Sequence, residues 1–367
     1  MTWRPRRASR ICTLVTAALV FDASRLDANF RAVAAAARAH GVTALFAAKS
    51  FPHPVVRALA ARHLDGFDAA SVGEIRELVA HNDPGRILSI VDPTAQASHC
   101  DLLARWHGRL VVGVETVDQV AAVPARAEIA IRTSASFGDR DPAVGAILDG
   151  TGRRRSRFGL DVDLATRREQ VRAIRAAASG RPVGIHLHHG LVVATTAERF
   201  IASIRDALGA FDDVEPAFID LGGAWHGIGI DGLDAAFAAI REAVPAHVEI
   251  VVEPGRLIAS GAGAARGRVV VARSLDDREL RVTELSRVCH LRWSQLSLVA
   301  KAPAPGRGRP TTWVGPTCYE EDVLGDWVAD PDEFPVGAVV TLAGVTGYAV
   351  AWNTGFGGVP PAQVIVE

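Results

Sequence analysis

The 367-residue sequence predicts an α/β fold, an eight-stranded parallel (β/α)8 barrel with a smaller C-terminal β-domain. Eight β-rich segments alternate with helical patterns up to residue 256, and beyond that residue the helical period disappears. The length suits a barrel of about 250 residues with a second domain.

The predicted barrel strands are mostly continuous apolar runs, which is typical of strands buried on both faces. In chain order they are TALFAA (43–48), GFDAA (66–70), RILSIV (86–91), RLVVGV (109–114), AEIAIR (127–132), VGIHLH (183–188), PAFIDL (216–221) and VEIVVE (248–253). The clearest helical patterns between them are at 24–40, 165–179, 197–209 and 232–243. Strands that alternate with helices pair in parallel, so eight of them predict a closed barrel.

The C-terminal part has the turn residues and short apolar runs of a β-domain. The runs RGRVVVARS, RELRVTEL, GAVVTLAG and GYAVAW predict antiparallel strands, and the Pro- and Gly-rich stretch 301–310 predicts a loop. An apolar run near 12–21 is expected to add an N-terminal strand to this sheet. We therefore expect a barrel over 22–256 and a β-domain made of 1–21 and 257–367.

The composition excludes several classes of function. The chain has 40 basic and 41 acidic residues, so no overall charge attracts it to nucleic acid or to a membrane surface. No apolar run reaches the roughly 18 residues of a membrane-spanning helix. The cysteines form no C-x-x-C pair, so we expect neither a metal site nor a disulfide framework, and a reducing cytoplasmic location fits best. They are Cys12, Cys100, Cys289 and Cys318.

The N-terminus allows two interpretations. Arginines precede a short apolar run, as in a secretory signal. The run is only about ten residues long, lacks a clear small-residue cleavage site and leads straight into an amphipathic helix, which favours a strand.

Polar residues gather where the predicted barrel strands end, and such barrels carry their chemistry at the C-terminal ends of the strands. The residues in question are Lys49, Asp68, Arg132, His186, His188, Asp220, Gly222, Gly223, Glu253, Gly255 and Arg256. A set of capping residues at the barrel rim is the alternative interpretation.

This set of residue types suits a pyridine aldehyde phosphate as the ligand. A lysine in a partly desolvated site can form an imine. A carboxylate such as that of Glu253 can keep the pyridine nitrogen protonated, which makes the ring an electron sink. A histidine can stack on the ring, glycines let backbone N–H groups approach the phosphate, and an arginine adds charge.

Eight motifs support that interpretation, in order along nearly the whole chain. They are FAAKSFPHP (46–54), GFDAASVGE (66–74), SRFGL (156–160), HLHHG (186–190), DLGGAWHG (220–227), VEPGR (252–256), GPTCYEEDVLG (315–325) and GYAVAWNTGFGG (347–358). Together they resemble the fold-type III pyridoxal-phosphate-dependent amino acid decarboxylases, which act on diaminopimelate, ornithine, arginine and related substrates.

The resemblance implies a role for each matching residue. Lys49 would hold pyridoxal 5′-phosphate as a Schiff base, His188 would stack on the ring and Glu253 would face the pyridine nitrogen. Cys318 would reach the active site of a partner subunit and protonate the carbanion, which implies a homodimer with shared sites. The remaining expected cofactor-binding residues are Asp68, Gly222, Gly223, Gly255, Arg256 and Tyr348.

Three positions around the expected phosphate site depart from the family pattern. The usual serine after H-x-H-x-G is Leu191, the third glycine of the phosphate turn is Ala224, and the F-N-G ending is F-G-G at 356–358. Loss of one phosphate donor would cost about 1–3 kcal/mol of cofactor binding.

The substrate side departs further. The acid that follows the cysteine in the family is Tyr319 here, and the stretch ELSRVCHLRWSQLSL (284–298) does not fit the family's D-x-G-x-x-D-x-x-R-P-x-x-Y pattern. We expect Arg132, Tyr319, Glu320 and Asp322 to face the substrate, which would be a non-standard amino acid. The arginines at 153–155 and 157 either meet a distal anion or form a solvated loop.

The resemblance implies decarboxylation of an amino acid, with Cys318 returning a proton to Cα. Two alternatives stay open: a racemase or another reaction on the same cofactor, and a non-catalytic regulatory relative. Alanine racemases place an arginine at the pyridine nitrogen, so the acid in VEPGR favours a decarboxylase. Retention of Lys49, His188, Glu253, Cys318 and Tyr348 argues against a non-catalytic role.

Overall fold

The computed structural model describes residues 17–81, 85–94, 99–133, 147–148, 154–160, 163–190, 192–212 and 214–367. The chain divides into two compact units. One unit is Ser24–Ser260, against the expected 22–256, and the other combines Met1–Ala23 with Gly261–Glu367.

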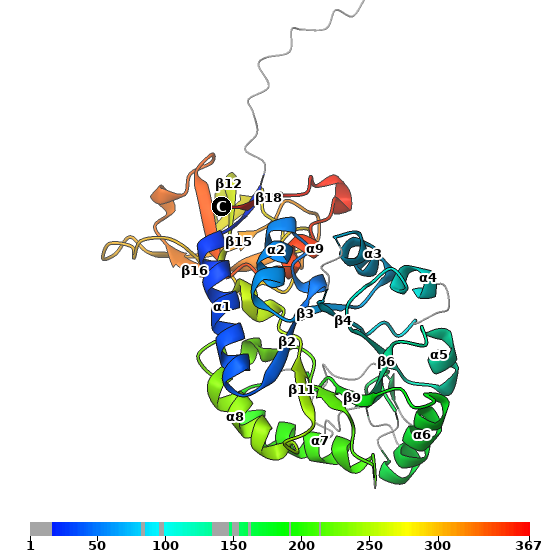
Figure 1. Ribbon diagram of the computed structural model, residues 1–367. Coiled ribbons are helices and arrows are strands. Elements are labelled where there is room, and N and C mark those ends of the chain that lie inside the picture. The colour runs from blue at the N-terminus through cyan, green and yellow to red at the C-terminus, as the bar shows by residue number, and fades with distance from the viewer. Residues whose placement is uncertain are drawn as a thin grey trace, which may run out of the picture. The chain divides into compact units, whose positions relative to one another are not determined.

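The first unit contains a closed parallel barrel, as predicted (Figure 1). Its strands are β2 (Val42–Ala47), β3 (Gly66–Ala69), β4 (Ile87–Ile90), β5 (Leu110–Val114), β6 (Glu128–Thr133), β9 (Val183–Leu187), β10 (Phe218–Asp220) and β11 (Glu249–Val252). They are paired in this order, and β11 closes the barrel against β2. All eight predicted strand segments are confirmed.

Helices surround these strands (Figure 1). They are α1 (Ala23–Ala39), α2 (Pro54–His63), α3 (Val72–His81), α4 (Cys100–Leu103), α5 (Val117–Ala122), α6 (Leu164–Ala177), α7 (Ala197–Gly209) and α8 (Leu233–Ala243). The four helices predicted from periodicity are α1, α6, α7 and α8, and all four are confirmed. In α7, for example, Phe200, Ser203, Ile204 and Ala207 are buried at the helical spacing.

The unit also contains a short two-stranded element. A short pair of strands, β7 (Ile147–Leu148) and β8 (Arg154–Arg155), lies between β6 and α6 in the sequence. Within the described ranges, no helix combines the length and apolarity needed to cross a membrane.

Charged residues hold together the end of the barrel where the strands begin. Arg109, just before β5, donates hydrogen bonds to Glu128 at 2.9 Å and to Glu249 at 2.9 Å. Its guanidinium also lies 5.6 Å from the ring centroid of Phe218, a core residue. These pairs connect the starts of β5, β6 and β11, at the end of the barrel opposite to the one where its chemistry is expected.

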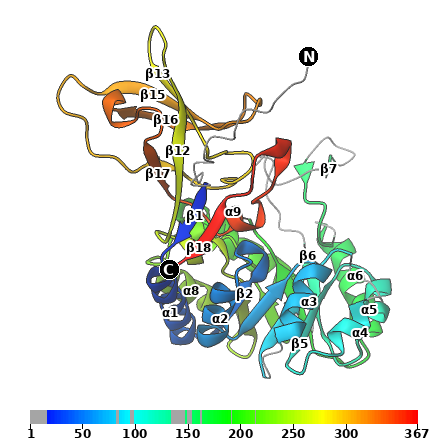
Figure 2. The ribbon, with the colours of Figure 1, turned by 90° about the horizontal axis from the view of Figure 1, so that it is seen from above.

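The second unit is built on one mixed eight-stranded sheet (Figure 2). Its strands are β1 (Ala18–Phe21), β12 (Gly263–Ser274), β13 (Glu279–Thr283), β14 (Ser297–Leu298), β15 (Arg309–Val314), β16 (Val323–Ala329), β17 (Val339–Ala343) and β18 (Gln363–Val366). The predicted N-terminal strand is confirmed for its described part, where β1 pairs with β12 and β18.

Two details of the β-domain prediction were wrong. The sheet is not wholly antiparallel, because β1 pairs with β18 and β13 pairs with β15 in parallel. The run GYAVAW forms no strand, because Tyr348–Ala351 is the short helix α9, and the Trp352 N–H donates to the Tyr348 carbonyl at 3.0 Å. This run is too short for its period to distinguish helix from strand. The predicted loop is irregular until β15 begins at Arg309.

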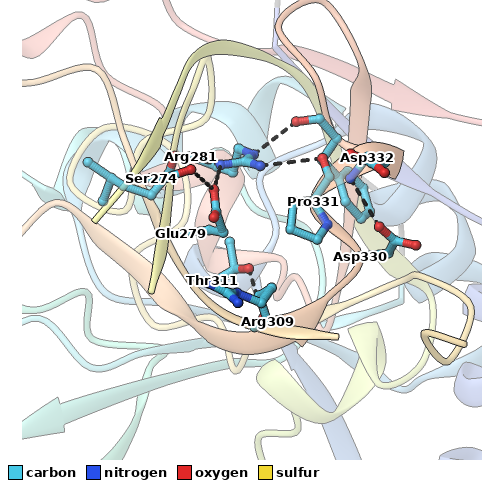
Figure 3. A network of polar contacts seen from close by, with 10 residues as sticks. Ser274, Glu279, Arg281, Arg309, Thr311, Asp330, Pro331 and Asp332 are labelled. Carbon is cyan, nitrogen blue, oxygen red and sulfur yellow. Dashed lines mark hydrogen bonds and ion pairs between the residues drawn. The ribbon is translucent and has the colours of Figure 1, made fainter. Parts of the chain in front are cut away.

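A buried ion pair anchors one side of the sheet (Figure 3). Arg281 in β13 donates to Glu279 at 3.1 Å and to the carbonyl oxygens of Phe334 and Pro331 at 2.9 and 3.3 Å. The Arg281 and Glu279 side chains are only 5% and 9% exposed. Arg281 therefore ties β13 to the segment that follows β16.

Glu279→Ala is expected to lower the free energy of unfolding by about 3 kcal/mol, because it leaves the Arg281 guanidinium buried without its carboxylate. The matched control is Asp332→Ala, which removes an exposed ion pair with Arg307 and should cost less than about 1 kcal/mol. Urea unfolding of both variants measures the difference. Equal costs would mean that burial does not decide the value of these pairs.

Candidate active site

The predicted lysine lies at the C-terminal end of a barrel strand. Lys49 is in a single 3-10 turn, η1 (Ala48–Ser50), which directly follows β2. Its Nζ donates to Oδ2 of Asp68 at 3.0 Å, and Asp68 lies on the neighbouring strand β3. The Lys49 side chain is 40% exposed, whereas the Asp68 side chain is fully buried. The ammonium group is thus held in place by a buried carboxylate and stays accessible to a ligand.

A second cluster forms at the ends of three other strands. His186 in β9, Asp220 at the end of β10 and Glu253 just after β11 are all buried. One nitrogen or oxygen from each lies within 4.8 Å of those of the other two. Glu253 Oε1 is buried and has no hydrogen-bond partner among the described residues. Such an oxygen suits an N–H donor supplied by a ligand.

Burial controls the charges of this site. It raises the pKa of Asp68 to about 6, with help from the negative charge of Glu253 and against the opposing effect of Lys49. Burial, the nearby Arg132 and Lys49 lower the pKa of His186 to about 3. His186 is therefore neutral at pH 7, and the site has a surplus of acidic groups that favours a protonated ligand.

His188 follows β9 and is exposed within this chain. Its Nδ1 accepts a hydrogen bond from the backbone N–H of Gly190 at 3.3 Å. On its other side is Gly222, whose φ is +61° and where an added Cβ would lie 2.8 Å from His188 Cδ2. The ring is thus fixed against a glycine turn, in a position to present a face to a flat ligand.

Glycines leave room beside these side chains. A Cβ at Gly223 would lie 3.0 Å from the Glu253 carbonyl oxygen, and one at Gly255 would lie 2.8 Å from the Ser50 Cβ. Any larger residue at Gly255 would displace the η1 turn that carries Lys49. Both glycines therefore allow backbone N–H groups to approach a bound anion closely.

The third position of the glycine turn keeps a glycine-like backbone although it is alanine. Ala224 has φ 70° and ψ 20°, the left-handed conformation. Trp225 supports this turn, since its Nε1 donates to the Gly222 carbonyl at 2.8 Å. The indole packs edge to face against Phe200 and Phe237. The turn survives the loss of the third glycine because buried aromatic residues hold it.

Arg256 lies at the start of the 3-10 turn η5 (Arg256–Ala259), and its Nη1 is 3.2 Å from His226 Nε2. Burial and the adjacent guanidinium lower the pKa of His226 to about 4. The neutral imidazole can accept this bond without placing a second positive charge beside the guanidinium.

Arg132 in β6 connects two segments of the barrel unit. Its guanidinium lies 4.1 Å from the ring centroid of Phe158, and that of Arg157 lies 3.9 Å from the same centroid. The Leu160 N–H donates to the Arg132 carbonyl at 2.8 Å, so SRFGL runs beside β6. Leu191 and Arg153 lie outside the described residues, as do the side chains of Arg154 and Arg155.

In the β-domain, the predicted substrate-side residues differ in exposure. Cys318, Tyr319 and Glu320 are exposed within this chain. Asp322 is buried, and its carboxylate accepts hydrogen bonds from the Ser286 hydroxyl at 3.0 Å, the Thr317 hydroxyl at 2.7 Å and the Arg287 N–H at 2.6 Å. The Asp322 carboxylate therefore holds the G-P-T-C loop together within its own domain.

Tyr348 lies beside aromatic residues, and sequence reasoning singled out neither Trp293 nor Trp352 among them. The Trp293 ring is 5.1 Å from that of Tyr348 and 5.5 Å from that of Trp352. Trp293 is 46% exposed and has φ 63°, a strained backbone for a tryptophan. Tyr319 packs at 5.2 Å on Phe356. The signal that could have found Trp293 is that the segment containing it, 284–298, departs from the family pattern.

The barrel site fits a planar ring with a protonated nitrogen and an anionic group. Glu253 offers a buried oxygen without a partner among the described residues, and Lys49 offers an accessible amine. The glycines at 222, 223 and 255 form a cradle that a Cβ would fill. Pyridoxal phosphate has the matching set of groups.

Comparisons with a family model and with known proteins point to the same family. A family model described as "Pyridoxal-dependent decarboxylase, pyridoxal binding domain" matches residues 24–260. The chain is 26% identical to a diaminopimelate decarboxylase of Pseudomonas aeruginosa, over 96% of this chain and 88% of that protein. It is 25% identical to an ornithine decarboxylase of Schizosaccharomyces pombe, over 88% of this chain and 77% of that protein.

The fold also matches a solved structure, the arginine decarboxylase of Paramecium bursaria Chlorella virus bound to agmatine. The TM-score is 0.76 at 19% identity, and the match covers 96% of each chain. At this identity the likeness concerns the fold alone.

Proposed function

The chain belongs to the pyridoxal-dependent decarboxylases, and from this membership we propose how its own residues act and which amino acids it accepts. It is a carboxy-lyase that uses pyridoxal 5′-phosphate to release carbon dioxide from an amino acid. When bound, the cofactor supplies an electron sink for the electron pair left by the departing carboxylate. The proposal rests mainly on one observation: Lys49, Asp68 and Glu253 lie close together at the strand ends.

We propose that the barrel residues bind and orient the cofactor. Lys49 would hold the cofactor through its aldehyde carbon, and Asp68 positions the Lys49 amine through the 3.0 Å hydrogen bond. Glu253 accepts the N–H of the ring nitrogen and keeps it protonated. His188 would stack on the ring, and the glycine turn would bind the phosphate. The phosphate-binding groups are Gly222, Gly223, Gly255, Arg256 and Tyr348.

We propose that Cys318, acting from a partner subunit of a homodimer, supplies the proton that Cα takes up after carbon dioxide leaves. Cys318 is exposed within one chain, as a group that acts on a neighbouring copy must be. Its loop is fixed by the buried Asp322 carboxylate, which bonds to Thr317, the residue before the thiol. The thiol is thus carried on an ordered loop and is available to return a proton to Cα.

For the substrate, we propose an amino acid whose side chain ends in an apolar or aromatic group rather than an amine. Tyr319 stands where the family has an acid, and it packs on Phe356 instead of offering a carboxylate. Trp293 and Trp352 of the same domain are also partly exposed, so the domain offers further aromatic surface. Arg292 stacks over Trp352 at 4.6 Å, and its positive charge disfavours a second cation.

A substrate screen by release of carbon dioxide tests this proposal. The wild-type protein, supplied with pyridoxal phosphate, should prefer phenylalanine-like or long apolar amino acids to ornithine, lysine, arginine and diaminopimelate. Tyr319→Asp should raise kcat/KM for the diamino acids about tenfold, because a carboxylate can bind the distal ammonium. Val328→Asp, at an exposed position of the same domain, should not. A wild-type preference for a diamino acid would contradict the proposed specificity.

A further inference from the structure

Asp220 has no role in the functions described above, although it is one of the most buried acids of the barrel. It ends β10, is 1% exposed and lies next to Glu253, which is 3% exposed. Its Oδ1 accepts a hydrogen bond from the Gly222 N–H at 2.9 Å. Two buried carboxyl groups with oxygens within 4.8 Å of each other are costly if both are charged.

The neighbouring basic groups cannot balance negative charges on both Asp220 and Glu253. His186, the nearest basic group of the cluster, is buried and neutral at pH 7. The cations that face the site are Lys49, which bonds to Asp68, and Arg132, which lies between Glu115 and Phe158. His188 is the remaining imidazole. Asp68 adds a further carboxylate and makes a second charge on the pair still less favourable.

Like charges in a desolvated site resolve this conflict by sharing a proton. Burial and the adjacent Glu253 both raise the pKa of Asp220 well above its ordinary value. Oδ1 of Asp220 accepts the Gly222 N–H, and a carbonyl oxygen is a better acceptor than a hydroxyl oxygen, which favours the proton on Oδ2. A proton on the Asp220 carboxyl therefore resides on Oδ2, where it can be donated to the Glu253 carboxylate.

We propose that Asp220 is a positioning residue that stays protonated on Oδ2 and donates a hydrogen bond to Glu253. The pair then carries one negative charge, which matches one protonated ring nitrogen. One Glu253 oxygen is held by Asp220, and the other, Oε1, is left for the ligand. The consequence for catalysis rests on the proposed function, whereas the shared proton belongs to the protein without its cofactor.

The first test uses three variants of the holoenzyme. Asp220→Leu has a similar size but no donor, and it should lower kcat about tenfold or more and shift the cofactor absorbance or its pH dependence. Asp220→Asn should recover kcat to within about threefold, because its amide oxygen accepts from Gly222 while its amide N–H donates to Glu253. If Asn behaves as Leu does, the ionised form of Asp220 is the active one and the proposal is wrong.

The second test needs no activity. In the cofactor-free protein, a proton that is held when folded and released when unfolded makes stability fall as pH rises above the ordinary aspartate pKa. Between pH 5 and 7 the folding equilibrium constant of the wild type should fall, relative to that of Asp220→Asn, by up to about tenfold per pH unit. Asp68 contributes to both proteins and cancels.

The outcomes separate the two proposals. The expected difference in pH slope, found in a protein that releases no carbon dioxide, would support the shared proton and contradict only the proposed function. Equal slopes would overturn the shared proton even if the enzyme is active. A bound metal ion whose removal by EDTA abolishes activity would also overturn it, because His186, Asp220 and Glu253 would then be its ligands.

Discussion

Lys49→Ala is expected to lower kcat/KM for decarboxylation by about 10³-fold or more, because it removes the amine that we propose binds the cofactor aldehyde. The chain offers an unusually clean control, since it contains only two lysines, Lys49 and Lys301. Lys301 is exposed in the loop before β15. Lys301→Ala should therefore have wild-type activity. Both variants are measured by release of carbon dioxide at saturating cofactor.

Circular dichroism of Lys49→Ala guards against a trivial explanation. Lys49 is part-exposed and lies in a single turn after β2, so its truncation should leave the barrel folded. Asp68 then loses its ammonium partner and takes up a proton more readily, which avoids a buried unpaired charge. Undiminished activity of a folded Lys49→Ala protein would contradict the assignment of Lys49.

Glu253→Gln is expected to lower kcat by about 10²-fold, because an amide cannot keep the ring nitrogen protonated as a carboxylate does. The substitution keeps the size of the side chain, so the glycine turn beside it is preserved. Glu242→Gln on the exposed face of α8 is the matched control and should leave kcat unchanged. The measurement is kcat together with the cofactor absorbance spectrum as a function of pH.

A different result would change the assigned chemistry. If Glu253→Gln kept the full kcat while Lys49→Ala lost it, the ring nitrogen would not depend on Glu253. The reaction would then not need a protonated ring nitrogen. That behaviour would favour the racemase alternative.

The barrel could be predicted from the sequence because its strands are buried on both faces. A strand such as β5 (Leu110–Val114) is a continuous apolar run that few other structures require. The candidate lysine and carboxylates followed from one rule of such barrels, the location of chemistry at the ends of strands. Lys49 and Asp68 are 19 residues apart in the sequence, and parallel pairing of β2 and β3 brings them together.

The β-domain was harder to predict because its contacts join distant positions. Asp322 was expected to face the substrate, yet its carboxylate is buried and bonds to Ser286, which is 36 residues away in the sequence. Tyr348–Ala351 adopts a helix although its composition also suits a strand. The aromatic contacts of Trp293 depend on its left-handed backbone conformation, which no local sequence pattern predicts.

The most direct test of the central claim is to incubate the purified protein with pyridoxal phosphate, reduce it with borohydride and map the labelled peptide. We expect a visible cofactor band that borohydride removes, with the label on Lys49 and none on Lys301. A label on Lys301 alone would mean nonspecific reaction at the surface. That result, or a protein that stays colourless and unlabelled, would contradict the barrel site as the place where the cofactor is bound.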